Sequence, residues 1–223
     1  MKRFFLFCLA VSVCISLIAC SGTKKAFEVS KSAYDSIDIA YDITEQFGSD
    51  LYEAWRIGIF EEDELLSDGA HYLSQQLNLS EEDIKKGIGY IYATSIVGEN
   101  WDTVAEEDKT KYYNRDSVLF KMKEDELFST CVWVVIYSYK LNGKVDEVQT
   151  ALNTAKEQMK ELSDKYSDYE HYPNLKGYYT TTSSFFDFCQ NPTGSFEQMK
   201  NTINDYKNEA RDYISDLDYI FEE

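Results

Sequence analysis

The side chains best suited to metal or acid–base chemistry are few in this sequence. Its two histidines, His71 and His171, lie far apart in the chain, and a metal site would require both to converge with carboxylates. The sequence has no His-Glu-x-x-His pair, no nucleophile elbow and no Walker glycine pattern. Gly87-Ile88-Gly89 lacks the third glycine of a phosphate-binding loop, and close helix packing explains it better. We therefore expect no metal, no cofactor and no catalytic residue.

Three short acidic runs, at 61–64, 81–83 and 106–108, supply many carboxylates. None of them has the alternating oxygen ligands and central glycine of an EF-hand loop. Carboxylates at a helix start interact favourably with the positive end of the helix dipole. We interpret the runs as helix starts and solvated faces. A glycosidase-type pair of carboxylates stays an alternative, although nothing in the sequence selects one pair.

Aromatic residues make up 15% of the chain, and they include three tryptophans. Trp55, Trp101 and Trp133 are candidates for lining a ligand groove, since aromatic faces bind sugars and, through cation–π contact, quaternary amines. Aromatic residues at helical spacing also pack between helices by default. We favour this second explanation.

Two cysteines, Cys131 and Cys189, lie in the body of the chain. Outside the cytoplasm they would be able to form a disulfide. Each lies among large apolar residues, however, and free cysteines are usually buried. Two buried free thiols are the favoured interpretation and a disulfide is the alternative, because sequence does not establish the close Cα approach that a disulfide needs.

The elements that would hold these side chains are predicted by helical periodicity. One row of apolar or small residues advances by alternating steps of four and three, and an aromatic row at Phe27, Tyr34, Tyr41 and Trp55 flanks it. The first row, here called the 26–58 stripe, comprises Ala26, Ser30, Ala33, Ile37, Ala40, Thr44, Phe47, Leu51, Ala54 and Gly58. Similar spacing recurs over 145–166 and 196–220. The pattern predicts long amphipathic helices at 24–59, 145–166 and 196–220.

Several residues mark where helices begin and end. Ser80 with Asp83, and Ser195 with Gln198, have the spacing of N-terminal capping motifs. Gly98 is expected to close the helix that begins at residue 81. Shorter helices are expected at 62–78 and, after a break at Pro173, at 174–190. Residues 99–117 show no clear pattern.

Residues 124–141 allow two structures. The run Cys-Val-Trp-Val-Val-Ile-Tyr would suit a strand, with Asn142-Gly143 as a hairpin turn. The segment that follows is helical and has no strand-like alternation to pair with. We therefore favour a buried helix that ends at Asn142-Gly143.

These elements predict an all-α fold. The chain has only 2 prolines and 10 glycines, as expected for long helices and few turns. We expect an antiparallel helical bundle of about four longer helices with shorter helical insertions, forming a single domain over 26–223. An intermolecular coiled coil is disfavoured, because the aromatic row makes the apolar stripe wider than a coiled-coil seam.

The net charge of −18 limits the partners. Such a charge repels nucleic acid, and no nucleic-acid partner is expected. It is compatible with a protein partner or another cationic partner. The aromatic content argues against disorder.

The N-terminus has the layout of a signal peptide. Lys2 and Arg3 precede an apolar run from Phe4 to Ile18, which small Ala19 separates from Cys20. The run is shorter than the about 20 residues that span a membrane.

At the end of this N-terminal segment, Leu17-Ile18-Ala19-Cys20 resembles the lipobox of bacterial lipoproteins. The resemblance implies that the Cys20 sulfur receives diacylglycerol and that the chain is cleaved before Cys20, with an ordinary secretory signal as the alternative. Residues 1–19 would be the signal peptide and residues 20–25 a lipidated tether. Each buried methylene adds about 0.8 kcal/mol, and two or three acyl chains anchor stably. The resemblance places the protein on the extracytoplasmic face of a bacterial membrane.

No motif in the rest of the chain indicates an activity. We expect a non-catalytic binding or interaction module, bound to the membrane through lipid on Cys20. One alternative is a receptor for a sugar, an amine or a peptide, with an aromatic-lined pocket between helices. A second alternative is a carboxylate-based hydrolase.

Overall fold

We analysed a computed structural model that describes the backbone of residues 2–115 and 124–221 and the side chains of residues 23–115 and 127–221. The described residues form helices and no strands, as the periodicity predicts. In chain order the helices are α1 (Lys2–Phe60), α2 (Glu62–Gln76), α3 (Glu81–Ile91), α4 (Glu106–Lys109), α6 (Glu124–Leu141), α7 (Lys144–Lys165), α8 (Tyr172–Gln190) and α9 (Phe196–Phe221). The short segments η1 (Tyr92–Val97), η2 (Trp101–Thr103) and η3 (Thr110–Tyr112) lie between α3 and α6.

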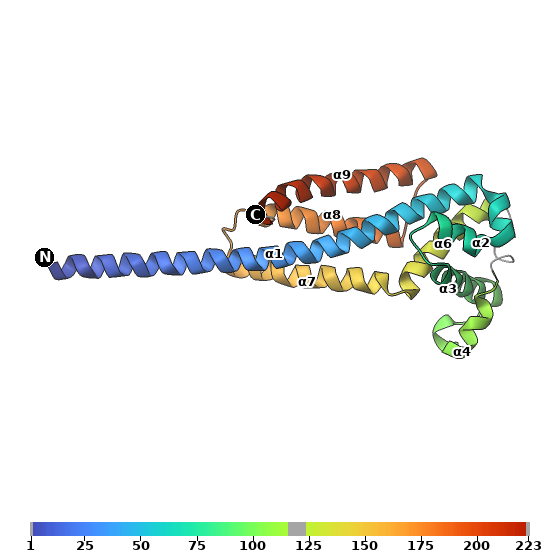
Figure 1. Ribbon diagram of the computed structural model, residues 1–223, viewed down its shortest axis with the longest axis horizontal. Coiled ribbons are helices and arrows are strands. Elements are labelled where there is room, and N and C mark those ends of the chain that lie inside the picture. Colours follow the sequence, from blue (N-terminus) through green and yellow to red (C-terminus); the bar gives the residue numbers. More distant parts are fainter. Residues whose placement is uncertain (1, 116–123, 222–223) are drawn as a thin grey trace.

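Helices α1, α7, α8 and α9 form an antiparallel bundle (Figure 1). Helices α1 and α8 run in one direction, and α7 and α9 run in the other. Helix α1 packs against each of the other three. The prediction of an antiparallel bundle of about four longer helices is therefore confirmed.

The shorter helices gather at one end of this bundle. Helices α2, α3, α4 and α6, with the η segments, form what we call the small lobe, at the end where α1 finishes (Figure 1). Helices α6 and α7 follow α1 in the opposite direction along its length. Phe47 stacks on Tyr139 of α6, with ring centroids 4.2 Å apart, whereas Gln158 of α7 donates from Nε2 to Ser32 Oγ at 2.6 Å.

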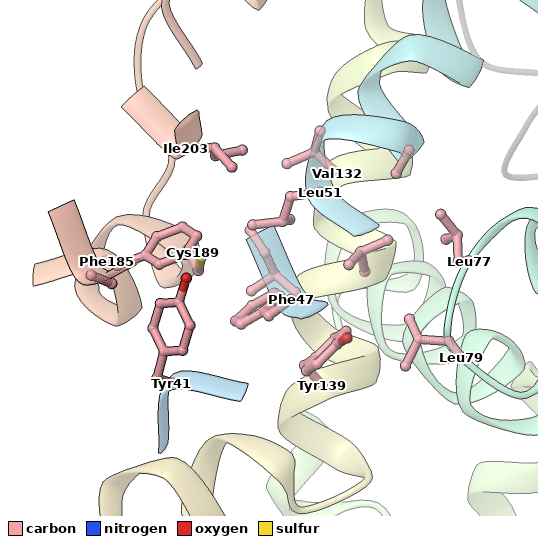
Figure 2. Packing of buried hydrophobic residues seen from close by; sticks show 14 of the residues in the cluster. Tyr41, Phe47, Leu51, Leu77, Leu79, Val132, Tyr139, Phe185, Cys189 and Ile203 are labelled. Atoms are coloured by element: carbon pink, nitrogen blue, oxygen red, sulfur yellow. The ribbon is translucent and has the colours of Figure 1, made fainter. Parts of the chain in front are cut away.

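The 26–58 stripe, on helix α1, forms the centre of the core. Every residue of the stripe is buried, and Figure 2 shows side chains from several helices around Phe47 and Leu51. Of the flanking row, Tyr34 and Tyr41 are buried and Phe27 is exposed. Since burying one large apolar side chain contributes about 1.5–3 kcal/mol, the stripe is a main source of bundle stability.

Two glycines allow helix α6 to approach its neighbours closely. A Cβ added at Gly58 of α1 would lie 2.5 Å from the Phe128 Cα, and one added at Gly87 of α3 would lie 2.5 Å from the Val134 carbonyl oxygen. Real Cβ atoms do not occupy such positions without displacing the backbone. The packing interpretation of Gly87 is therefore confirmed.

Both predicted N-terminal caps are present. The Asp83 backbone N–H donates to Ser80 Oγ at 3.1 Å. The Gln198 N–H donates to Ser195 Oγ at 3.3 Å, while the Ser195 N–H donates to Gln198 Oε1 at 2.8 Å. This reciprocal pair satisfies two backbone donors at the start of α9.

The predicted helix ends are also present. Gly98 and Gly143 have φ values of 80° and 85°, in the left-handed region that ends helices. Residues 124–141 form helix α6, as favoured over a strand. The helix predicted from residue 81 ends in the π-helical turn η1 just before Gly98.

Some boundaries differ from those predicted. Helix α8 begins at Tyr172, so that Pro173 lies in its first turn and does not precede it, because the first turn does not use the backbone N–H that proline lacks. Helix α2 ends at Gln76, before the predicted residue 78, and bends at Asp68. Helix α1 begins at Lys2 in place of residue 24. Residues 116 and 117 of the unassigned segment lie outside the described residues.

The N-terminal predictions are not tested by the fold. The side chains of Leu17-Ile18-Ala19-Cys20 lie outside the described residues, and lipidation stays a prediction. Among the described residues, no helix combines the length and the apolar composition needed to cross a membrane.

Candidate functional site

Two of the three tryptophans belong to one aromatic row in the small lobe. Trp133 contacts Tyr137 with ring centroids 6.0 Å apart, Tyr137 stacks on Tyr90 at 3.8 Å, and Tyr90 contacts Trp101 at 5.5 Å. Trp133 is 44% exposed, whereas Trp101 is buried. The row therefore leads from the surface of the lobe into its interior.

Trp55 lies in a separate aromatic cluster. It stacks on Phe128 of α6 at 5.6 Å and meets Phe196 of α9 edge-on at 6.2 Å. Phe196 also contacts Tyr52 and Phe60. The structure therefore separates Trp55 from Trp101 and Trp133, and it places Trp55 in the packing where α1, α6 and α9 meet.

The histidines occupy opposite ends of the molecule. In the small lobe, His71 Nδ1 lies 3.1 Å from Glu81 Oε2. In the connection between α7 and α8, His171 Nε2 lies 3.2 Å from Glu170 Oε1. Within the described residues, no three histidine, cysteine or carboxylate side chains are placed to hold a metal ion. The acidic runs lie at the first turns of α2, α3 and α4.

The two cysteines are buried free thiols. A Cβ added at Gly58 would lie 3.3 Å from Cys131 Sγ, and one added at Gly48 would lie 3.5 Å from Cys189 Sγ. These glycines are about 15 Å apart along α1, at 1.5 Å per residue. The sulfurs are therefore too far apart for a disulfide, and burial raises the pKa of both thiols.

Large exposed apolar side chains are concentrated at the small lobe and the adjoining end of α1. In that region they are Ile59, Phe60, Ile96, Val97 and Trp133. Elsewhere among the described residues they are Phe27, Ile39 and Tyr219. Phe60 is 67% exposed although its ring contacts Phe196. Exposed apolar residues mark an interaction surface where they form a contiguous patch.

A buried carboxylate in α1 was not anticipated from the sequence. Asp50 is 2% exposed. Its Oδ1 accepts from the Asn78 backbone N–H at 3.0 Å and from Asn78 Nδ2 at 2.9 Å, and its Oδ2 accepts from Tyr139 Oη at 2.8 Å. Burial raises the pKa of Asp50, while these hydrogen bonds act in the opposite direction.

The spacing of Asp50 carries a signal that would have revealed it. Asp50 follows Phe47 by three residues and precedes Ala54 by four, which places it on the buried face of the helix. An acidic residue on such a face requires partners when it is buried. The partners come from distant parts of the chain, and no local pattern indicates them.

A polar cavity of about 380 Å³ lies beside Asp50. Helix α1, the connection between α2 and α3, and helix α9 surround it. Its charged and amide lining includes Asp50, Glu53, Asn78, Lys200, Asn204 and Lys207. None of the three tryptophans lines it. Tyr52 is the one aromatic residue among the described residues that line it.

Lys207 is held at the edge of this cavity. Its Nζ donates to Ser49 Oγ at 2.8 Å and lies 3.5 Å from Glu45 Oε1. The Lys207 side chain is only 19% exposed. Helix α9 thus holds one ammonium group close to the turn of α1 that carries Asp50.

A second group of carboxylates, Asp38 and Asp42 of α1 and Asp218 of α9, lies closer to the N-terminal end of α1. Tyr178 Oη donates to Asp38 Oδ1 at 3.1 Å, and Tyr34 Oη donates to Asp218 Oδ1. Burial and the charge of Asp42 raise the pKa of Asp38. Burial, with the neighbouring Glu45, also raises the pKa of Asp42. The hydrogen bonds of Asp38 and Asp218 hold α1 against α8 and α9.

Comparison of the chain with protein-family models, with curated proteins and with solved structures found no match.

Proposed function

We propose that the mature protein is a lipid-anchored, non-catalytic interaction module on the outer face of a bacterial membrane, with its binding surface on the small lobe. The resemblance of Leu17-Ile18-Ala19-Cys20 to a lipobox supports the anchor. The surface proposal depends on one observation, the exposed apolar side chains at the end of the bundle opposite the tether.

The geometry of α1 supports this arrangement. Ala26 follows Cys20 by a few residues and is buried beside the connection between α7 and α8, where it lines a cavity with Tyr166 and Tyr169. From Lys24 to Phe60 the helix extends about 54 Å at 1.5 Å per residue. A chain tethered at Cys20 would therefore be able to hold the small lobe well away from the bilayer.

The chemistry of the small lobe favours a protein partner. Phe60 and Trp133 provide exposed apolar surface, and aromatic residues are enriched where proteins bind one another. The acidic first turns of α2, α3 and α4 lie in the same lobe. A partner with an apolar contact and basic residues around it would match this surface.

Photo-crosslinking in cells tests the surface part of the proposal. A benzophenone amino acid placed at Phe60 is expected to crosslink the full-length protein to a protein partner. The same group at Tyr219, which is 77% exposed near the tethered end of the bundle, serves as the matched control and is expected to give no such product. Equal crosslinking at both positions, or none at Phe60, would contradict the surface assignment.

The anchor is tested separately with Cys20→Ser. This change removes the only sulfur to which the proposed lipid is attached, so we expect the protein to leave the membrane fraction. Membrane fractionation with intact-mass measurement is the readout. A variant that stays in the membrane fraction at its normal processed mass would contradict the lipid anchor. The crosslinking result for the small-lobe surface would not be affected by that outcome.

A further inference from the structure

We infer that the cavity between α1, the α2–α3 connection and α9 binds a small zwitterion that carries one ammonium and one carboxylate group, of the size of a free amino acid. This inference does not depend on the lipid anchor or on the small-lobe surface. It follows from the opposite charges that two helices bring to one cavity.

The α1 side of the cavity suits a ligand ammonium group. Asp50 and Glu53 supply its carboxylates. Glu53 is already paired with Arg56, whose Nη2 donates to Glu53 Oε1 at 2.6 Å, so Asp50 is the carboxylate without a cationic partner among the described residues. The hydrogen-bond partners of Asp50, Asn78 and Tyr139, are neutral. A carboxylate offers about four acceptor positions, and three donors reach Asp50, which leaves one position on Oδ2. A ligand ammonium group would supply the positive charge that this buried carboxylate lacks.

The α9 side suits a ligand carboxylate. Lys200, Asn204 and Lys207 all line the cavity, and their spacing of four and three residues places them along one face of the helix. An ammonium group has three donors. One N–H of Lys207 donates to Ser49 and a second points toward Glu45. The third N–H is therefore available to a ligand carboxylate.

Size and polarity narrow the ligand class further. A cavity of about 380 Å³ lies near the lower limit of the about 300–1,000 Å³ usual for ligand sites. The amide groups of Gln76, Asn78 and Asn204 also line it, and amides donate and accept hydrogen bonds. A small polar molecule with two opposite charges matches this lining better than a simple ion of either sign.

The first test compares ligands on the purified mature protein in detergent. Glycine, L-alanine and glycylglycine carry both charges, whereas acetate and phosphate carry only negative charge and methylamine only positive charge. Because a ligand that binds the folded state raises Tm, we expect at least one zwitterion to raise Tm and the three single-charge probes to leave it unchanged at equal concentration. Equal shifts with acetate or phosphate would reassign the cavity to anions and overturn the proposal, as would no response to any zwitterion at millimolar concentration.

The second test uses matched variants and measures Kd by calorimetry. Lys200 is exposed, so Lys200→Gln should fold normally, and we expect it to weaken binding of the responding zwitterion by about tenfold, or about 1.4 kcal/mol. Lys176→Gln removes an exposed lysine from α8, away from the cavity, and should leave Kd unchanged.

Asp50→Asn tests the ammonium side and should weaken binding by at least the same factor. If this variant does not fold, the pair of lysine variants still decides the outcome. Equal Kd values for Lys200→Gln and Lys176→Gln would overturn the proposal.

Discussion

Two buried tyrosine hydroxyls differ in their partners and should differ in their effect on stability. Tyr139 Oη donates to the buried Asp50 carboxylate at 2.8 Å. Tyr41 Oη is buried with no hydrogen-bond partner among the described residues, and burial is the main cause that raises its pKa to about 12. An unsatisfied buried polar group costs about 1–3 kcal/mol, whereas a satisfied one contributes to stability.

We therefore predict opposite results for two substitutions of the same kind. Tyr139→Phe should lower the free energy of unfolding by about 1–3 kcal/mol, because Asp50 loses a donor. Tyr41→Phe should leave it unchanged or raise it by about 1 kcal/mol. Urea denaturation of both variants beside the parent protein measures the difference. A larger loss in Tyr41→Phe than in Tyr139→Phe would show that the two hydroxyls have been assigned the wrong roles.

The pH dependence of stability should also reflect Asp50. Its pKa is raised above the ordinary value of 3.8, chiefly by burial, so the folded protein binds this proton more tightly than the unfolded chain. The contribution of Asp50 to the free energy of unfolding therefore falls as the pH rises from about 3.8 through the raised pKa. Asp38 and Asp42 have raised pKa values and act in the same direction. The lowered pKa values of Glu61 and Glu81 act in the opposite direction.

We predict that Asp50→Asn weakens this trend. The substitution removes one titrating group with a raised pKa, so the loss of stability between pH 4 and neutral pH should be smaller than in the parent protein. Urea denaturation across this range provides the measurement, and Asp35→Asn, at an exposed site on the same helix, provides the control. Identical slopes for parent and Asp50→Asn would mean that Asp50 does not contribute to the trend.

At the scale of elements, the close contact of α1 with α6 joins the bundle to the small lobe. It depends on Gly58, because a Cβ there would lie 2.5 Å from the Phe128 Cα. Backbone atoms cannot rotate away as a side chain can. Any larger residue would have to move one helix relative to the other.

We therefore predict that Gly58→Ala destabilises the protein by about 1–3 kcal/mol despite the higher helix propensity of alanine. Gly98→Asn is the matched control, since Gly98 has open space around it and a φ of 80°, which asparagine tolerates. Thermal denaturation compares the two variants. A Tm for Gly58→Ala at or above that of the parent would show that α1 and α6 can separate without loss.

The caps of α3 and α9 show that the position at which a helix begins is determined by nearby residues. Ser80 and Ser195 bond to backbone groups three residues ahead, and such contacts depend only on nearby residues. The same holds for Gly143, whose left-handed φ ends α6. Helix ends were predictable where a side chain or a glycine marks them. The predicted break at Pro173 was wrong, because proline is tolerated within the first turn of a helix as well as before one.

At the scale of the whole molecule, α1 connects three features. It carries the predicted tether at one end, the Asp50 cavity in its second half, and exposed Ile59 and Phe60 where it meets the small lobe. The cavity takes residues from both the α2–α3 connection of the lobe and α9 of the bundle. A ligand there would contact both parts of the molecule.

The sequence was enough to predict the longer helices, the buried face of α1 and the caps, because each of these depends on residues within a few positions of one another. It also indicated the lipobox, which is a contiguous motif and stays a prediction. The fold was needed to show which helices meet, that the tryptophans divide between two clusters, and that Cys131 and Cys189 lie too far apart to bond. It alone revealed the Asp50 cavity, because Asn78, Tyr139 and Lys207 reach that carboxylate region from distant parts of the chain, and the distance between such residues is set by packing and not by local spacing.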